Sequence, residues 1–155
     1  MNFKAIALDP GLFAAWTQLS DGDLTERSAR RCVADEQPGF PCRVSLHDAP
    51  IGERLILLPY AHHDVRSPYR AAGPIFVRER AERWPETVGV VPPVLRTRLL
   101  SLRAYDAQGM MLDADVIAGE AVEPRIASML ADAKIDYLHV HFARRGCYAC
   151  RIERA

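Results

Sequence analysis

The sequence lacks a long hydrophobic run, an excess of charge of either sign and any complete catalytic signature. No segment approaches the roughly 18 consecutive apolar residues that a membrane-spanning helix needs. Twenty basic residues balance twenty acidic ones, so no overall field attracts nucleic acid or an anionic membrane surface. We therefore expect neither a membrane nor a nucleic acid among the partners of this protein.

Residues 1–10 contain no basic segment followed by a long apolar core, so they do not have the pattern of a secretory signal. This pattern predicts a cytoplasmic location, where the four cysteines would stay largely reduced. A length of 155 residues, of which 49% are hydrophobic, is that of one ordinary domain. We therefore expect a single domain over residues 1–155.

Several short segments have the residue patterns of β-strands. Apolar and polar residues alternate in residues 42–47, which predicts a half-buried strand. Residues 55–58 are all apolar and predict a buried strand, which Pro59 ends or confines to a sheet edge. Further strands are predicted at residues 3–8, 31–34 and 75–77, and a long loop at residues 79–97.

Two pairs of segments have the pattern of β-hairpins. Residues 98–105 and 110–117 flank a turn that ends in glycine, and residues 137–142 and 148–153 flank another. In the first hairpin, alternate apolar residues of the two strands are expected to share one buried face. These residues are Leu100, Leu102, Ala104, Leu112, Ala114 and Val116.

Three helices complete the prediction. The Asp-Pro pair at residues 9–10 is typical of a helix start, and a second short helix from Asp21 has Ser20 and Asp23 as a capping box. A third helix is predicted near residues 124–133. Strands that arrive as hairpins with short connections favour antiparallel pairing. The predicted fold class is therefore α+β, with an antiparallel sheet built largely from hairpins.

His139 and His141 are two residues apart on a predicted strand, so their side chains leave the same face of the sheet. Two imidazoles in this arrangement can supply two ligands to one metal ion. A metal site would need at least one further ligand, from another histidine or a carboxylate. The alternative is a polar strand face with ordinary hydrogen-bonded histidines.

Other polar residues lie at the ends of predicted strands, where the strand fixes a side chain and the loop exposes it. Tyr60 and His62 follow the buried strand; a solvated turn is the alternative, more so for His63 than for His62. Tyr69 and Arg70 precede a glycine, and a guanidinium offers a planar pair of donors to a carboxylate or phosphate. These residues predict an anion-binding loop, unless Arg70 pairs with a structural carboxylate.

The segment 147–150, Cys-Tyr-Ala-Cys, has the spacing of a redox pair or of half a zinc knuckle. A redox pair normally opens a helix, whereas these residues lie on a predicted strand. A zinc knuckle needs a second pair, and Cys32 and Cys42 are too far apart to form one. Structural cysteines are the better interpretation.

The segments 41–46, 67–78 and 146–148, together with Tyr60 and His62, resemble the bacterial family catalogued as domain of unknown function 1203. The resemblance covers nearly the whole chain. It implies a compact bacterial protein of a single domain, and it implies no activity, cofactor or substrate.

The residues favour binding of a small anionic molecule in a pocket lined by His, Tyr and Arg, with Arg70 holding the anion. The predicted ligand-binding residues are Tyr60, His62, Tyr69, Arg70, His139 and His141. One alternative is a metal-dependent enzyme in which His139 and His141 hold a metal with a bound water. Another is a non-enzymatic interaction module, with a protein partner or a second copy of the chain in a homodimer.

Overall fold

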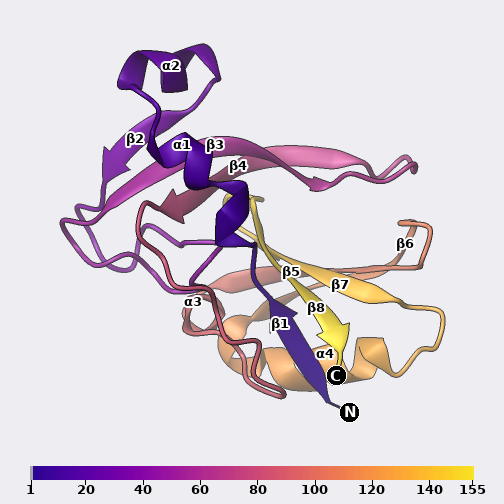
Figure 1. Ribbon diagram of the computed structural model, residues 1–155. Helices are drawn as coiled ribbons and strands as arrows, with labels where there is room; N and C mark the ends of the chain where they lie inside the picture. Colours follow the sequence, from indigo (N-terminus) through magenta and orange to yellow (C-terminus); the bar gives the residue numbers. More distant parts are fainter. Residues whose placement is uncertain (1) are drawn as a thin grey trace.

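The computed structural model describes residues 2–155, which form two antiparallel sheets in separate layers (Figure 1). The strands are β1 (Phe3–Ile6), β2 (Arg30–Val33), β3 (Arg54–His63), β4 (Ala71–Arg78), β5 (Leu99–Tyr105), β6 (Met111–Ala118), β7 (Tyr137–Phe142) and β8 (Tyr148–Arg154). The larger sheet has the order β1-β8-β7-β5-β6 and the smaller one β2-β3-β4. The predicted α+β class, with antiparallel sheets built from hairpins, is confirmed.

The helical elements are short, and two of them, η1 and α2, start where the capping residues predict. They are η1 (Pro10–Leu12), α1 (Ala14–Thr17), α2 (Asp21–Glu26), α3 (Pro93–Arg96), η2 (Gly119–Ala121) and α4 (Val122–Leu130). The Asp9 carboxylate accepts a hydrogen bond from the amide of Gly11 at 2.7 Å. Ser20 and Asp23 form the predicted capping box at the start of α2. The helix predicted near 124–133 ends earlier, and α3 interrupts the segment expected to be a loop.

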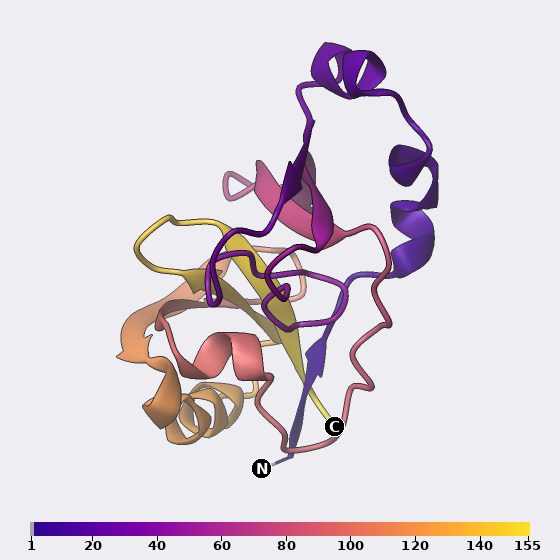
Figure 2. The same cartoon turned by 90° about the vertical axis from the view of Figure 1, so that its left-hand side faces the viewer.

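Two main apolar clusters hold the layers together. In the first, α4 covers the outer face of the larger sheet (Figures 1 and 2), and Ile126 packs there with Leu102 and Val140. In the second, Phe13 joins alternate residues of β3 and β4, such as Ile56 and Ile75. The face of the larger sheet that points away from α4 takes no part in this first cluster, and polar and aromatic side chains of β7, such as His139 and His141, lie on it.

Residues 42–47 do not form the predicted strand. Isolated bridges and turns replace it, and Leu46 has a positive φ of 50°. The backbone amides of Arg43, Trp84 and Val94 tie the segment to β4 and to the loop after β4, instead of to a neighbouring ladder. Because it is covered on several sides, even Arg43 is only 1% exposed.

Strand β3 runs through Pro59 to His63 instead of stopping at the proline. The ladder between β2 and β3 ends where Arg30 lies opposite Leu57. Beyond that point β3 has no partner on its β2 side, so a residue without an N–H group costs no ladder hydrogen bond. The strand can therefore deliver Tyr60, His62 and His63 to the larger sheet.

The hairpin of β5 and β6 is confirmed, but the predicted shared face is wrong. An irregularity beside Tyr105 sets the register so that Leu102 lies opposite Asp115. A shift of one residue exchanges the two faces of a strand. Leu112 and Val116 are consequently 47% and 58% exposed, on the edge strand of the sheet.

Candidate functional site

Histidine and tyrosine rings from both sheets meet in a group that we call the histidine–tyrosine cluster. The ring centroids of His62 and His141 are 5.0 Å apart, and that of His139 lies 6.2 Å from His62 and 6.3 Å from His141. Three of the predicted ligand-binding residues therefore come together. The cluster consists of His62, His63, Tyr105, Tyr137, His139, His141 and Tyr148.

The alternation of β7 brings the two late histidines into this cluster. Leu138 and Val140 enter the core below the sheet, so His139 and His141 must leave its other face. A register shift between β7 and β8 places Tyr148 opposite His141. Both histidines are nearly inaccessible, at 2% and 1% exposed, so the face is buried instead of partly solvated.

Hydrogen bonds define the protonated nitrogen of two histidines. His63 donates from Nδ1 to the carbonyl oxygen of Tyr69 at 2.8 Å, and its Nε2 accepts from the Tyr137 hydroxyl at 2.8 Å. His141 donates from Nδ1 to the carbonyl oxygen of Gly146 at 3.0 Å. In neutral His141 the other nitrogen, Nε2, is therefore an acceptor.

Several of these ring nitrogens are left without a partner. Within residues 2–155, Nε2 of His141 and Nδ1 of His139 are buried and make no hydrogen bond. Buried polar atoms usually have a partner in the protein or in ordered water. These two atoms therefore have unused hydrogen-bonding capacity in a buried position.

Burial keeps three of the histidines, His62, His139 and His141, uncharged at neutral pH. Desolvation, together with neighbouring His63, lowers the pKa of His139 to about 2. Desolvation also lowers the pKa of His141 to about 3. For His62, desolvation and the nearby Arg103 guanidinium lower the pKa to about 4. Neutral imidazoles contribute no positive charge to an anion site.

Neutral imidazole is also the form that binds metal ions. Over the described residues, however, no group of three or more His, Cys, Asp or Glu side chains is placed to hold a metal. The metal site at His139 and His141 stays a prediction from the sequence.

The other predicted residues lie at the margin of the cluster or outside it. Tyr60 lies between Phe13 and Tyr148, with ring centroids 6.0 Å and 6.4 Å away. Tyr69 is 39% exposed. Arg70 forms an ion pair with Asp64 at 2.8 Å, and the two side chains are 69% and 64% exposed. The charge of Arg70 is thus already matched at the surface.

A concave site lies beside the hairpin turn between β7 and β8, outside the cluster, and we call it the arginine groove. It has a volume of about 750 Å³. Segment 36–43, the smaller sheet, the start of β5 and the turn 142–147 all contribute to it. Its polar lining is dominated by Arg43, Arg98, Arg144 and Arg145.

Arg43 is the buried member of this set. Its Nε donates to the carbonyl oxygen of Tyr148 at 2.7 Å, and Nη1 donates to that of Pro41. Its Cζ lies 5.0 Å from the ring centroid of Phe142. Among residues 2–155 no carboxylate is close enough to form an ion pair with it. Burial lowers the pKa of the Arg43 guanidinium, yet arginine stays protonated in proteins.

The other arginines of the groove differ in their partners. Arg98 donates to both oxygens of Asp48, at 2.8 Å and 2.6 Å, and its Cζ is 5.0 Å from the centroid of the Phe142 ring. Arg144 and Arg145 are exposed in the turn. Within the described part of the chain neither has an ion-pair partner. The positive charge of Arg98 is matched, and those of Arg144 and Arg145 are open to a ligand.

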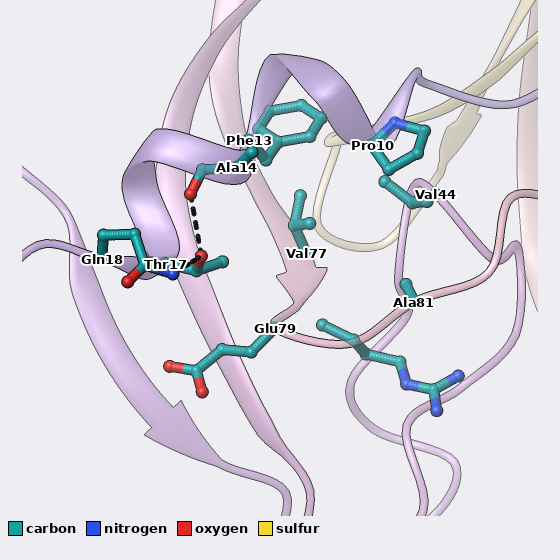
Figure 3. A pocket seen from close by; sticks show the side chains of 10 residues that line it. Pro10, Phe13, Ala14, Thr17, Gln18, Val44, Val77, Glu79 and Ala81 are labelled. Atoms are coloured by element: carbon teal, nitrogen blue, oxygen red, sulfur yellow. Dashed lines mark hydrogen bonds between the residues drawn. The ribbon is translucent and has the colours of Figure 1, made fainter.

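A smaller cavity of about 260 Å³ lies between α1 and the end of β4 (Figure 3). Its lining includes Thr17, Val77 and Glu79. Arg31 and Arg54 engage the carboxylate of Glu79 at 2.6 Å and 3.4 Å. Because this charge is already matched within the protein, the cavity offers no free ionic group.

Sequence reasoning missed the arginine groove. Arg43 was assigned to the polar side of a half-buried strand, whereas the whole segment is buried. The signal in the sequence is a single arginine among alternating apolar and uncharged polar residues after Pro41, and two adjacent arginines, Arg144 and Arg145, in a hairpin turn.

Comparisons with known proteins give a family and no activity. No helix of residues 2–155 has the length and apolarity required to cross a membrane. No curated protein and no solved structure matches the chain significantly. The family described as "Protein of unknown function (DUF1203)" matches residues 39–154, a span that contains the histidine–tyrosine cluster and all four arginines of the arginine groove. The chain therefore belongs to the DUF1203 family.

Proposed function

We propose that the protein binds a small anionic molecule, and that the arginine groove holds it. The observation that carries this proposal is Arg43, which lines the groove and whose buried guanidinium has no carboxylate partner among residues 2–155. Removing a charge from water costs several kcal/mol, of order 3–5 where its partner is missing. Two carbonyl oxygens offset part of this cost, and an anion in the groove would supply the missing opposite charge.

The balance of charge around the groove supports the same conclusion. Four arginines line it, while Glu36 is the acidic residue of the lining and Asp48 neutralises Arg98. The groove therefore has an excess of positive charge on a chain whose overall charge is zero. Concave sites concentrate such a field and attract ligands of opposite sign.

The histidine–tyrosine cluster is the second candidate position, because Nε2 of His141 and Nδ1 of His139 are buried without partners. His62, His139 and His141 are neutral, so the charge of an anion bound to them would have to be held by Arg103 instead of by imidazolium. Arg103 contacts Oγ of Ser101 at 3.5 Å and lies opposite His139 in the sheet. Ligand binding at His62, His139 and His141 remains a proposal at this second position.

Calorimetric titration of the untagged protein with inorganic phosphate and benzoate tests both positions. The groove is altered by Arg144→Ala with Arg145→Ala, two exposed positions where loss of the side chain leaves the fold intact. Arg103→Ala alters the histidine–tyrosine cluster. Arg70→Ala alters the anion-binding loop that the sequence predicts. Arg66→Ala is the matched control, since Arg66 is an exposed arginine outside the groove.

We expect the double substitution in the groove to weaken anion binding at least tenfold, and the Arg66 control to leave it unchanged. Arg43→Lys, which keeps the charge but loses the planar fork, should weaken it further if circular dichroism shows that the variant is folded. Loss of binding in Arg103→Ala, with the groove variant unaffected, would move the site to the cluster. Equal binding by all variants would overturn the proposal.

A further inference from the structure

We infer that the anion held by the arginine groove carries a sizeable apolar group, so that its ligand class is an amphipathic organic carboxylate or phosphate. This inference rests on the proposed function and adds the chemistry of the rest of the ligand. Three features of the groove support it: its size, the separation of its apolar and cationic walls, and the position of Arg43 between them.

The groove is too large for a bare oxyanion. Its volume of about 750 Å³ lies in the range of sites for drug-sized ligands, roughly 300–1,000 Å³. A water molecule takes up about 30 Å³ in the liquid, and an oxyanion with a few heavy atoms is only a few times larger. Most of the space must therefore be filled by another part of the ligand or by water.

The apolar and cationic linings come from different parts of the chain. Phe40, Leu57 and Phe76 are contributed by the segment before Arg43 and by the smaller sheet. The rings of Phe40 and Phe76 pack at 5.2 Å with an interplanar angle of 55°. All three side chains are only partly buried, so a ligand could remove further apolar surface from water.

The cationic lining comes from the connection just before β5, which supplies Arg98, and from the β7–β8 turn, which supplies Arg144 and Arg145. Arg43 lies where the two linings meet. Its backbone amide donates to the carbonyl oxygen of Phe76 at 3.1 Å, while its guanidinium lies over the ring of Phe142. An anion that reaches the Arg43 guanidinium thus lies next to the apolar wall, and a group attached to it can cover that wall.

The reactivity of Cys147 can report ligand binding in the groove, because this half-exposed residue is part of the groove lining. The other half-exposed cysteine, Cys32, can be removed as Cys32→Ser, while Cys42 and Cys150 are buried. In this background the rate of thiol labelling by dithiodipyridine, an uncharged reagent, measures access to Cys147. Ligands that fill the groove should slow the reaction, and Cys147→Ser identifies the background rate.

The probes are acetate and inorganic phosphate as bare anions, naphthoate and octanoate as amphipathic anions, and naphthamide as an uncharged analogue. We expect naphthoate or octanoate to protect Cys147 at concentrations at least tenfold lower than acetate. Phe40→Ala should reduce this advantage while leaving protection by phosphate unchanged. Leu112→Ala replaces an exposed leucine on β6 that is not part of the groove lining, and it should change neither the protection by naphthoate nor that by phosphate.

Failure of the inference and failure of the proposed function give different results. If acetate and phosphate protect as well as naphthoate and octanoate do, the groove binds anions but the apolar group has no role, and the inference is overturned. If naphthamide protects as well as naphthoate, the arginines do not select for charge and the proposed function fails. If none of the probes protects an accessible Cys147, both are overturned.

Discussion

His63 and Tyr137 join the two sheets through a hydrogen bond of 2.8 Å, donated by the Tyr137 hydroxyl to Nε2 of the imidazole. Because Nδ1 of His63 donates to the carbonyl oxygen of Tyr69, Nε2 of the neutral ring is the acceptor of this bond. His63 is 3% exposed and Tyr137 4%. The bond therefore lies in the interior, between the end of β3 and the start of β7.

Tyr137→Phe should destabilise the protein, because it leaves the Nε2 acceptor of His63 buried without a donor. Such a loss costs about 1–3 kcal/mol. Tyr69→Phe is the matched control, since this tyrosine is 39% exposed and its hydroxyl can be replaced by water. Urea unfolding at neutral pH should show a lower midpoint for Tyr137→Phe alone; equal midpoints would mean that the bond contributes nothing.

Stability should fall as the pH decreases from about 6 to about 4. Burial lowers the pKa of His139 to about 2 and that of His141 to about 3, whereas an unfolded histidine titrates near pH 6.5. In this window the unfolded chain binds the extra protons, so acid favours unfolding. Each such histidine contributes a slope of about 1.4 kcal/mol per pH unit, which urea unfolding at several pH values measures.

His141→Gln tests the origin of that slope. The variant removes one of the buried titrating groups. The slope of its free energy of unfolding against pH should therefore be smaller by about 1.4 kcal/mol per pH unit, which is the contribution of one proton. The slope is the readout, because any loss of packing lowers stability at every pH alike. An unchanged slope would show that other groups cause the acid sensitivity.

Gly119→Ala should be among the most damaging substitutions in the chain. A Cβ atom at this position would lie 1.8 Å from the carbonyl oxygen of Leu95, so α3 or the end of β6 would have to move. We expect a loss of about 3 kcal/mol or more. Gly73→Ala is the control, because no atom lies within 4 Å of its added Cβ, and thermal melts of the two variants give the comparison.

Metal analysis tests the alternative that His139 and His141 bind a metal ion. After incubation with zinc or cobalt salts and gel filtration, we expect no equimolar metal, because the described residues provide no group of three ligands in position. Equimolar metal that is lost in His141→Gln would instead show that the histidines rearrange around an ion. That result would support the metal-dependent alternative predicted from the sequence.

Local signals were sufficient for most of the fold. The turn glycines Gly109 and Gly146 both have φ of 78°, and each closes one of the two predicted hairpins. Their strands form because alternation and turn chemistry act over a few residues. The burial of residues 42–47 could not be predicted in this way, since it depends on a distant loop that covers them.

The candidate sites show the same limit. The shared face of His139 and His141 follows from the two-residue period of a strand, which is a local property. Their approach to His62 depends on how the two sheets pack, which no short segment encodes. Arg43 is buried because β4 and the β7–β8 turn both cover it. The sequence shows only a single arginine among alternating apolar and polar residues, so its burial could not be predicted.

The hydrogen bond from His141 to the carbonyl oxygen of Gly146 gives the protein a built-in spectroscopic probe. Gly146 stands between Arg145 and Cys147, so the same short turn touches the groove on one side and an imidazole on the other. A ligand that moves the carbonyl group of Gly146 relative to the ring would alter the length of this bond, and with it the nitrogen and proton resonances of His141. Occupancy of the groove can thus be followed by NMR with isotope-labelled histidine, without attaching a dye to the protein.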